Sequence, residues 1–334
     1  MTKINKWLWA TALASSVSIA VAADALPTEA PAPADNPTTP AKVALGKMLY
    51  HDPRLSSTGT VACASCHNVM AGGEDNRPVA MGVNGQTGGR SAPTVWNSAF
   101  NKVQFWDGRA ESLEAQAAGP VTNPIEMGIK SWDDVVARLE KIEGYKKAFA
   151  DAFGGNAISK DTATKAIAAY ERTLITPNSP YDRYVTGEKD AMTDQQVRGM
   201  NKAVELGCTG CHSGPAFNGP GVFQKFPVTS NGMYQAKYNF SKDKGLAEVT
   251  KKSEDEHMFK VPTLRNIALT APYFHNGAVK TLDEAVRVMA KLQLNKDLSK
   301  EEIADIAAFL NALTGEFPKQ EMPVLPPTPG STFN

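Results

Sequence analysis

Apolar residues recur at helical spacing in several stretches, and the last stretch is the clearest. Ser299 and Glu302 form a capping box at its start, and Gly315 follows its end. The apolar positions between them lie on one helical face: Ile303, Ile306, Ala307, Leu310 and Leu313. The pattern predicts an amphipathic helix that packs on a core.

Four further helices are predicted from similar patterns. One covers residues 42–50 and stops at His51-Asp52-Pro53. In the second, Ser131 begins a helix that carries Val135, Val136 and Leu139. In the third, Ser159 or Asp161 begins a helix with Ala163, Ile167, Tyr170 and Leu174, and Pro177 stops it. In the fourth, Thr193 with Gln196 caps a helix with Val197, Met200 and Val204, which ends at Gly207. The chain is predicted to be mainly α-helical.

The segments between these helices are predicted as irregular structure. Residues 214–232 are rich in Gly and Pro and favour a loop, whereas residues 241–257 are mostly charged and favour a solvated excursion. The segment from Pro177 to Asp190 is the predicted domain boundary. The Pro-rich stretch after Pro318 is predicted to be extended.

The first 23 residues have the pattern of a cleavable secretory signal. Lys3 and Lys6 precede an apolar run that is short for a membrane span, and small residues follow at 20–23. The formal charge of the whole chain is zero, and removal of the two lysines leaves 33 basic against 35 acidic residues. The charge balance argues against a nucleic-acid partner. The signal pattern predicts an exported protein without a membrane span.

Two short motifs carry the chemistry of the chain. Cys63-Ala64-Ser65-Cys66-His67 is followed 145 residues later by Cys208-Thr209-Gly210-Cys211-His212. Cys-x-x-Cys-His is the pattern of covalent c-type haem attachment. The cysteines Cys63, Cys66, Cys208 and Cys211 would form thioethers, and His67 and His212 would be proximal iron ligands.

Zinc binding and disulfide formation are the alternatives for these cysteines. Paired Cys-x-x-Cys zinc motifs normally lie about 15–20 residues apart, whereas 141 residues separate Cys66 from Cys208. A zinc site also leaves the shared trailing histidine unexplained. Disulfides remain open for an exported chain, although closely spaced cysteines are more typical of a reactive dithiol. Attachment of two haems is the favoured interpretation.

Both motifs follow a predicted helix, which favours two tandem cytochrome c-like domains, each with one covalent haem and joined by loops. Met289 lies between the second motif and the last helix, where small cytochromes c place an axial methionine. The predicted division is residues 1–23 as signal peptide, 24–41 as a Pro/Ala-rich linker, 42–185 and 186–318 as the two haem domains, and 319–334 as an extended tail.

Several longer segments resemble the bacterial dihaem cytochrome c peroxidases, which are related to the MauG enzymes. The resemblance covers roughly residues 45–315. It is carried by Leu45-Gly46-Lys47-Met48-Leu49, Gln104-Phe105-Trp106-Asp107-Gly108-Arg109-Ala110, Phe259-Lys260-Val261-Pro262-Thr263-Leu264-Arg265-Asn266 and Pro272-Tyr273-Phe274-His275.

The resemblance implies a periplasmic peroxidase. Family members reduce hydrogen peroxide to water with electrons from a small periplasmic cytochrome c or a cupredoxin, and they are commonly homodimers. By resemblance, the haem on His67 is peroxidatic, and the haem on His212 receives electrons and has Met289 as its distal ligand. Trp106 matches the tryptophan between the haems.

The resemblance also assigns catalytic residues. Glu126 would take a proton from one peroxide oxygen and return it to the leaving oxygen, and Gln116 would hold the peroxide or product water. Val83 stands where gated members have a distal histidine, so we expect activity without reductive activation. Met81 or Asn84 as a substitute ligand is the alternative.

The resemblance further implies a calcium ion between the domains. Its carbonyl ligands match Thr270 and Pro272, but Ser91 replaces the family's asparagine, which weakens the site. Two other functions stay open: a non-catalytic dihaem electron carrier, and a MauG-like oxidase of a protein substrate. Met289 argues against the second, because the MauG enzymes have a tyrosine there.

Overall fold

The computed structural model describes residues 23–155, 158–328 and 330. The predicted signal peptide therefore lies outside the described residues, apart from Ala23. Within the described ranges, no helix has both the length and the apolar character needed to cross a bilayer.

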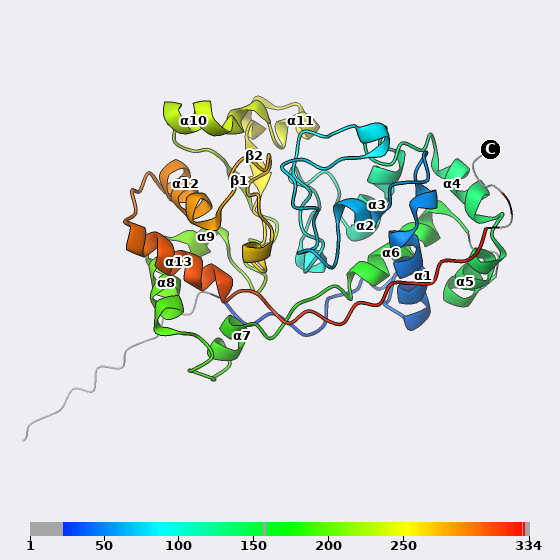
Figure 1. Cartoon of the computed structure of the whole chain (residues 1–334), viewed down its shortest axis with the longest axis horizontal. Coiled ribbons are helices and arrows are strands. Elements are labelled where there is room, and N and C mark those ends of the chain that lie inside the picture. Colours follow the sequence, from blue (N-terminus) through cyan, green and yellow to red (C-terminus); the bar gives the residue numbers. More distant parts are fainter. Residues whose placement is uncertain (1–22, 156–157, 329, 331–334) are drawn as a thin grey trace, which may run out of the picture.

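The molecule is mainly helical, as predicted, and has two lobes side by side along its long axis (Figure 1). The first lobe contains α1 (Pro40–His51), α2 (Cys63–Cys66), α3 (Leu113–Thr122), α4 (Trp132–Leu139), α5 (Glu143–Phe153) and α6 (Lys160–Glu171). The second contains α7 (Pro180–Val185), α8 (Asp194–Glu205), α9 (Cys208–Cys211), α10 (Gly232–Tyr238), α11 (Ala247–Thr250), α12 (Leu282–Leu294) and α13 (Lys300–Asn311).

The predicted helix starts are confirmed. Ser131, Ser159, Thr193 and Ser299 each accept a hydrogen bond from a backbone N–H in the first turn of the helix that follows. This satisfies one of the N–H groups that a helix start leaves without a partner inside the helix. Short polar side chains at these positions therefore fix where the elements begin.

A glycine allows close helix packing in each lobe. A Cβ atom on Gly46 of α1 would lie 1.9 Å from the carbonyl oxygen of Ala166 in α6. A Cβ atom on Gly199 of α8 would lie 1.8 Å from the carbonyl oxygen of Asp305 in α13. The helix that leads to each Cys-x-x-Cys-His motif thus crosses another helix where only glycine fits.

Separate hydrophobic clusters form the cores of the lobes. One extends from Leu45 to Leu174 and fills the first lobe. The second lobe has two clusters: one between α8 and α13, which includes Tyr181 of α7, and one around Phe240 and α12. Two short antiparallel strands, β1 (Phe223–Lys225) and β2 (Met258–Lys260), pair with Phe223 opposite Lys260.

The segments predicted as irregular are more structured than expected. Residues 214–232 contain β1, because its backbone groups pair with β2. Residues 241–257 contain α11 and return to the first lobe: Asp243 and Glu248 pair with Arg90, which also binds Asp107. Residues 248–254 are exposed, as a solvated excursion requires, but Asp243 and Glu248 bind a partner that is distant in sequence.

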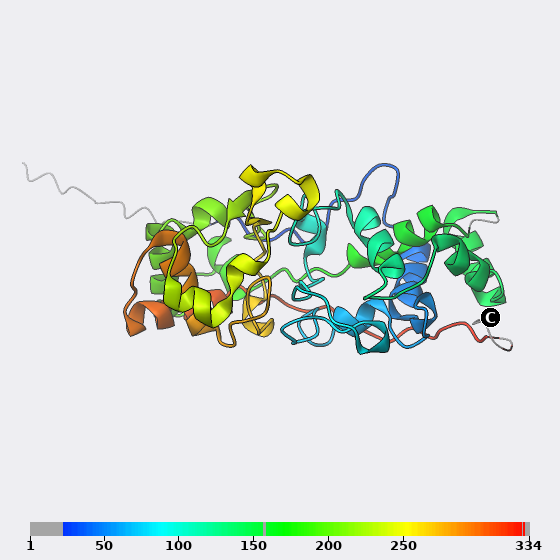
Figure 2. The same ribbon diagram turned by 90° about the horizontal axis from the view of Figure 1, so that it is seen from above.

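The two ends of the described chain both run from the second lobe to the first (Figures 1 and 2). The first segment starts at the second lobe, where Leu26 N donates to Asp182, and reaches the first lobe, where Asn36 donates to Glu114. The last segment leaves α13 and also reaches the first lobe, where the carbonyl of Pro326 accepts a hydrogen bond from Arg54 at 2.9 Å. These contacts hold the lobes together.

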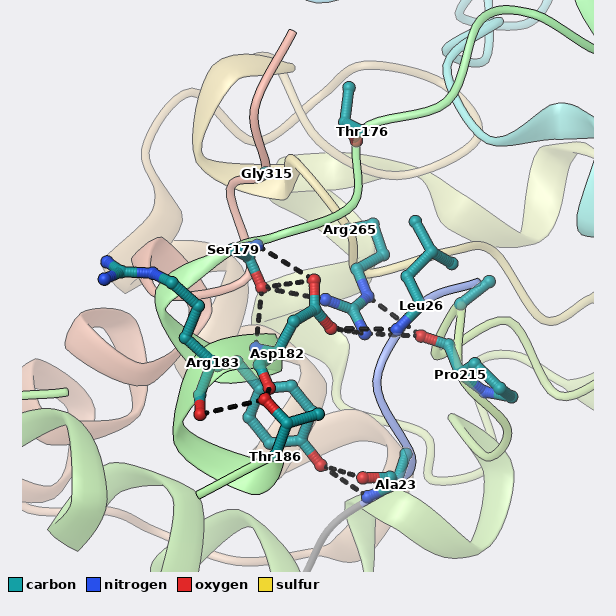
Figure 3. A network of polar contacts seen from close by, with 12 residues as sticks. Ala23, Leu26, Thr176, Ser179, Asp182, Arg183, Thr186, Pro215, Arg265 and Gly315 are labelled. Carbon is teal, nitrogen blue, oxygen red and sulfur yellow. Dashed lines mark hydrogen bonds and ion pairs between the residues drawn. The ribbon is translucent and has the colours of Figure 1, made fainter. Parts of the chain in front are cut away.

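A buried ion pair stabilises the second lobe near this crossing (Figure 3). Arg265 has a fully buried side chain and binds Asp182 at 2.8 Å. Its guanidinium also donates to the Ser179 hydroxyl and to the Pro215 carbonyl. Because burial of an unpaired charge is costly, the pair and its hydrogen bonds fix α7 against the loop after α9.

Candidate functional site

A cavity of about 900 Å³ opens beside the first Cys-x-x-Cys-His motif; most of its lining comes from the first lobe, and Asp243 and His275 of the second lobe also line it. Cys63, Cys66 and His67 line it, together with the predicted catalytic residues Gln116 and Glu126. Gln116 comes from α3, and Glu126 comes from the turn that follows α3. The motif and the two predicted catalytic residues, up to 63 positions apart, therefore converge on one space large enough for a cofactor.

The His67 ring is held in the orientation that an iron ligand needs. Its Nδ1 lies 2.9 Å from the Pro93 carbonyl oxygen, so Nδ1–H donates and Nε2 keeps its lone pair. Burial lowers the pKa of His67 and favours the neutral ring. Neither cysteine of this motif is in a disulfide, which removes that alternative for this pair. The residues present fit a covalently attached haem.

Glu126 lies in the same cavity with a carboxyl group that can exchange a proton. Its Oε1 accepts a hydrogen bond from Asn123 Nδ2 at 2.6 Å. Burial raises the pKa of Glu126 above its ordinary value, and Arg109 and Asn123 oppose this shift. Such an environment suits a group that must both accept and release a proton near neutral pH.

The loop around Val83 packs against the turn that carries Glu126. Val83 is 2 % exposed and packs in the core of the first lobe, and its N–H donates to the Glu126 carbonyl at 2.8 Å. Met81 and Asn84 are exposed and do not line the cavity. The loop thus supports Glu126 and directs none of these three side chains into the cavity.

The second motif has a different setting. His212 Nδ1 lies 3.2 Å from the Phe217 carbonyl and 3.1 Å from the Pro262 carbonyl, which again leaves Nε2 available. Cys208 packs against the cluster between α8 and α13, whereas Met289 packs against the cluster around α12. Ile267 and Leu282 border both clusters, so the residues suited to hold a second haem lie at their junction.

Trp106 lies between the surroundings of the first motif and those of the second. It lines the cavity of the first lobe and also packs against the cluster that contains Met289. Its Nε1 donates to the Ser91 carbonyl at 2.9 Å, and its ring meets His275 edge to face at 6.3 Å between centroids. This half-buried indole is fixed between the lobes.

The predicted calcium residues lie near this junction. Ser91 N donates to the His275 carbonyl at 2.7 Å, three residues beyond Pro272, and Thr270 is nearby in the same loop. Asn76 Nδ2 donates to the Ala271 carbonyl at 3.2 Å and to Glu74 at 2.6 Å. Among the described residues, no three His, Cys, Asp or Glu side chains gather as a metal site.

Two buried charged residues were missed from the sequence. Lys260 is 9 % exposed, its backbone N donates to the Trp106 carbonyl, and burial lowers its pKa to about 8. Glu171 lines the cavity at the end of α6. Glu171 follows the apolar Ile167 by four positions, and this helical spacing was the signal that could have placed it on the buried face.

Comparisons with known proteins agree with this site. The model of the di-haem cytochrome c peroxidase family matches residues 40–190. The chain is 46% identical over 291 residues to the cytochrome c peroxidase Ccp of Escherichia coli, covering 86% of this chain and 61% of that protein. It is 44% identical over 290 residues to the cytochrome c551 peroxidase of Nitrosomonas europaea, covering 86% and 84%. The chain belongs to the di-haem cytochrome c peroxidase family.

A solved structure extends the likeness to the fold. The crystal structure of a MauG-like protein associated with microbial copper homeostasis superposes with a TM-score of 0.78 at 29% identity, covering 93% of this chain and 96% of that protein. The predicted family is confirmed, and the names of the relatives support a peroxidase enzyme. Membership of a di-haem family implies two c-type haems.

Proposed function

We propose that this di-haem peroxidase reduces hydrogen peroxide to two waters in the periplasm, with electrons from a small c-type cytochrome or a cupredoxin. The convergence of His67, Gln116 and Glu126 on one cavity carries the proposal. Haems bound at Cys63 and Cys66 and at Cys208 and Cys211 would supply the redox chemistry. The two lobes would then be two tandem cytochrome c-like domains.

The protein residues divide the remaining work. Glu126 accepts a proton from one peroxide oxygen and returns it to the leaving oxygen, and its partly buried carboxyl group suits both steps. Gln116 orients the peroxide by hydrogen bonding. His67 holds its ring through the Pro93 carbonyl. As a ligand of a second haem, Met289 would favour ferrous iron, and that haem would then receive the external electrons.

Electrons pass between the lobes beside Trp106. This indole touches the cavity on one side and packs against the cluster of Met289 on the other. Its hydrogen bond to Ser91 restricts its motion. A fixed aromatic side chain in this position would shorten the path between haems held at the two motifs.

The loop around Val83 supports activity without prior reduction. Its backbone binds the Glu126 carbonyl, and its side chain is packed away from the cavity. A haem attached at the first motif would therefore meet no ligand from the side chains of this loop, and the oxidised protein would be ready to bind peroxide. Calcium bound at Thr270, Pro272 and the Ser91 hydroxyl, and a homodimer, are further parts of the proposal.

A peroxidase assay tests the function. The holoprotein is mixed with hydrogen peroxide and a reduced small c-type cytochrome, once as the fully oxidised enzyme and once after partial reduction. We expect immediate oxidation of the donor in both cases. No turnover in either case would favour an electron carrier, and turnover only after partial reduction would reject the open distal side.

A MauG-like oxidation of a protein substrate is the second candidate, since a MauG-like protein shares the fold. Met289 distinguishes the two. A thioether ligand favours ferrous iron, whereas oxidation of a protein requires stable high-valent iron. Peroxide-dependent modification of a partner protein, without oxidation of a small cytochrome, would support the second candidate.

A further inference from the structure

Glu171 is a buried acid in the cavity that the proposed peroxide chemistry does not use. It is the last residue of α6 and is 6 % exposed. Its Oε2 is fully buried and has no hydrogen-bond partner among the described residues. Buried polar atoms are nearly always paired, so an orphaned carboxyl oxygen at a cofactor cavity indicates a functional constraint.

The surroundings of Glu171 penalise its charged form. It interacts electrostatically with Tyr50 of α1, Cys63 of α2 and Glu114 of α3, and Tyr170 and Arg172 are its neighbours in sequence. Burial raises the pKa of Glu171 to about 8, Arg172 opposes the shift and Glu114 adds to it. The single cation in this group, Arg172, is already bound to Glu114 at 2.7 Å.

We propose that Glu171 couples proton uptake to reduction of the first haem: when one electron reduces ferric to ferrous iron, the Glu171 carboxylate binds one proton. The step balances, because one negative charge enters with the electron and one positive charge with the proton. The proposal rests on the proposed function, since it requires a haem at Cys63 and Cys66.

Simple electrostatics predicts this coupling for a carboxyl group that lines the cavity of a bound haem. Reduction removes one positive charge from the iron, so a nearby carboxylate loses an attractive interaction and binds a proton more tightly. By linkage, protonation of Glu171 favours reduction to the same extent. Reduction of peroxide to two waters consumes two electrons and two protons, and Glu171 provides a buried acceptor for one of them.

Glu114 is the second carboxyl group on this side of the cavity, and it raises the pKa of Glu171. Its side chain is 17% exposed and accepts hydrogen bonds from Arg172 and from Asn36, both at 2.7 Å. Glu114 therefore has partners for its charge, whereas Glu171 Oε2 has none among the described residues.

A redox titration of the holoprotein between pH 6 and pH 10 tests the proposal. In the wild type, we expect the ratio of reduced to oxidised first haem, at one applied potential, to fall up to tenfold per pH unit over a range that includes pH 8. In Glu171→Gln, the ratio should not change with pH over that range. Asp161→Asn is the matched control, because Asp161 is exposed on the same helix.

Either of two results overturns the proposal: a wild-type ratio that is independent of pH, or the wild-type pH dependence in Glu171→Gln. Infrared difference spectra of the wild type provide a test without any variant. Reduction of the first haem should produce a band of a protonated carboxylic acid, and its absence also overturns the proposal.

The same preparation separates this proposal from the proposed function. Two attached haems and normal peroxide turnover, with a pH-independent potential, reject only the coupling at Glu171. A pH-dependent potential without peroxide turnover rejects only the peroxidase function.

Discussion

The two Cys-x-x-Cys-His motifs share their ligand chemistry but differ in what surrounds them. His67 is oriented by one carbonyl and faces a cavity with Gln116 and Glu126. His212 is oriented by two carbonyls and lies at the junction of two apolar clusters, one of which includes Met289. The motif thus fixes the attachment of a haem, whereas the distal residues decide whether it reacts or only transfers electrons.

Removal of the two cysteines of one motif at a time should have the largest effect on haem content and on peroxide turnover. Replacement of Cys63 and Cys66 by alanine should leave one covalent haem and abolish peroxide turnover. The matched pair, Cys208 and Cys211 to alanine, should keep the first haem but stop electron supply from the donor. Mass spectrometry of the denatured proteins counts the haems, and two haems in either variant would contradict the assignment.

Glu126→Gln tests the reactive site next. Loss of a general base typically costs about 10²–10⁴-fold in rate, so peroxide turnover should fall by that order while both haem spectra stay unchanged. Glu111→Gln is the control, because Glu111 is exposed in the same lobe. A variant with wild-type turnover would show that another group moves the proton.

The pH profile of the wild type sharpens this test. Because the pKa of Glu126 is raised, its basic form is lost as the pH falls through a value above the ordinary glutamate range. The acid limb of kcat/KM should therefore lie above that range in the wild type and disappear in Glu126→Gln. An acid limb in the ordinary range would contradict the effect of burial.

Met289→His tests the electron-receiving site. Exchange of the thioether for imidazole should lower the potential of the second haem by on the order of 0.2 V, within the roughly 0.8 V that axial ligands span. The potential of the first haem should stay unchanged. Met322→Leu is the control, because Met322 is exposed in the tail. An unchanged second potential would exclude Met289 as an iron ligand.

Asp182→Asn should have the smallest effect on the two haem sites, because its expected effect is on the stability of the second lobe. The change leaves the buried Arg265 with a neutral partner, and loss of one member of a buried pair costs about 3–5 kcal/mol. Denaturant unfolding should therefore begin earlier in the second lobe. Asp305→Asn, whose partner Arg198 is 57% exposed, should change the midpoint much less. Equal effects would contradict the role of burial.

The sequence predicted local structure better than contacts between distant segments. Ser159, Thr193 and Ser299 marked helix starts because a cap depends on a few neighbouring residues. The pairing of Arg90 with Asp243 joins residues 153 positions apart and had no local signal.

In the candidate site, too, local motifs were predicted from the sequence and contacts between distant residues were not. The two motifs predicted His67 and His212 directly, because their spacing determines their chemistry. Gln116 and Glu126 were reached only through resemblance, and the structure then brought both into the cavity of His67. Glu171 was missed because an acid at the end of an amphipathic helix is ordinarily solvated, and only packing against α1 and α3 buries it.

The central claim is that the two haem sites differ in the openness of their distal sides. An EPR spectrum of the fully oxidised holoprotein, recorded before and after addition of peroxide, tests it most directly. We predict one high-spin ferric signal from the first haem and one low-spin signal from the second, with only the high-spin signal lost on adding peroxide. Two low-spin signals that peroxide leaves unchanged would contradict the account.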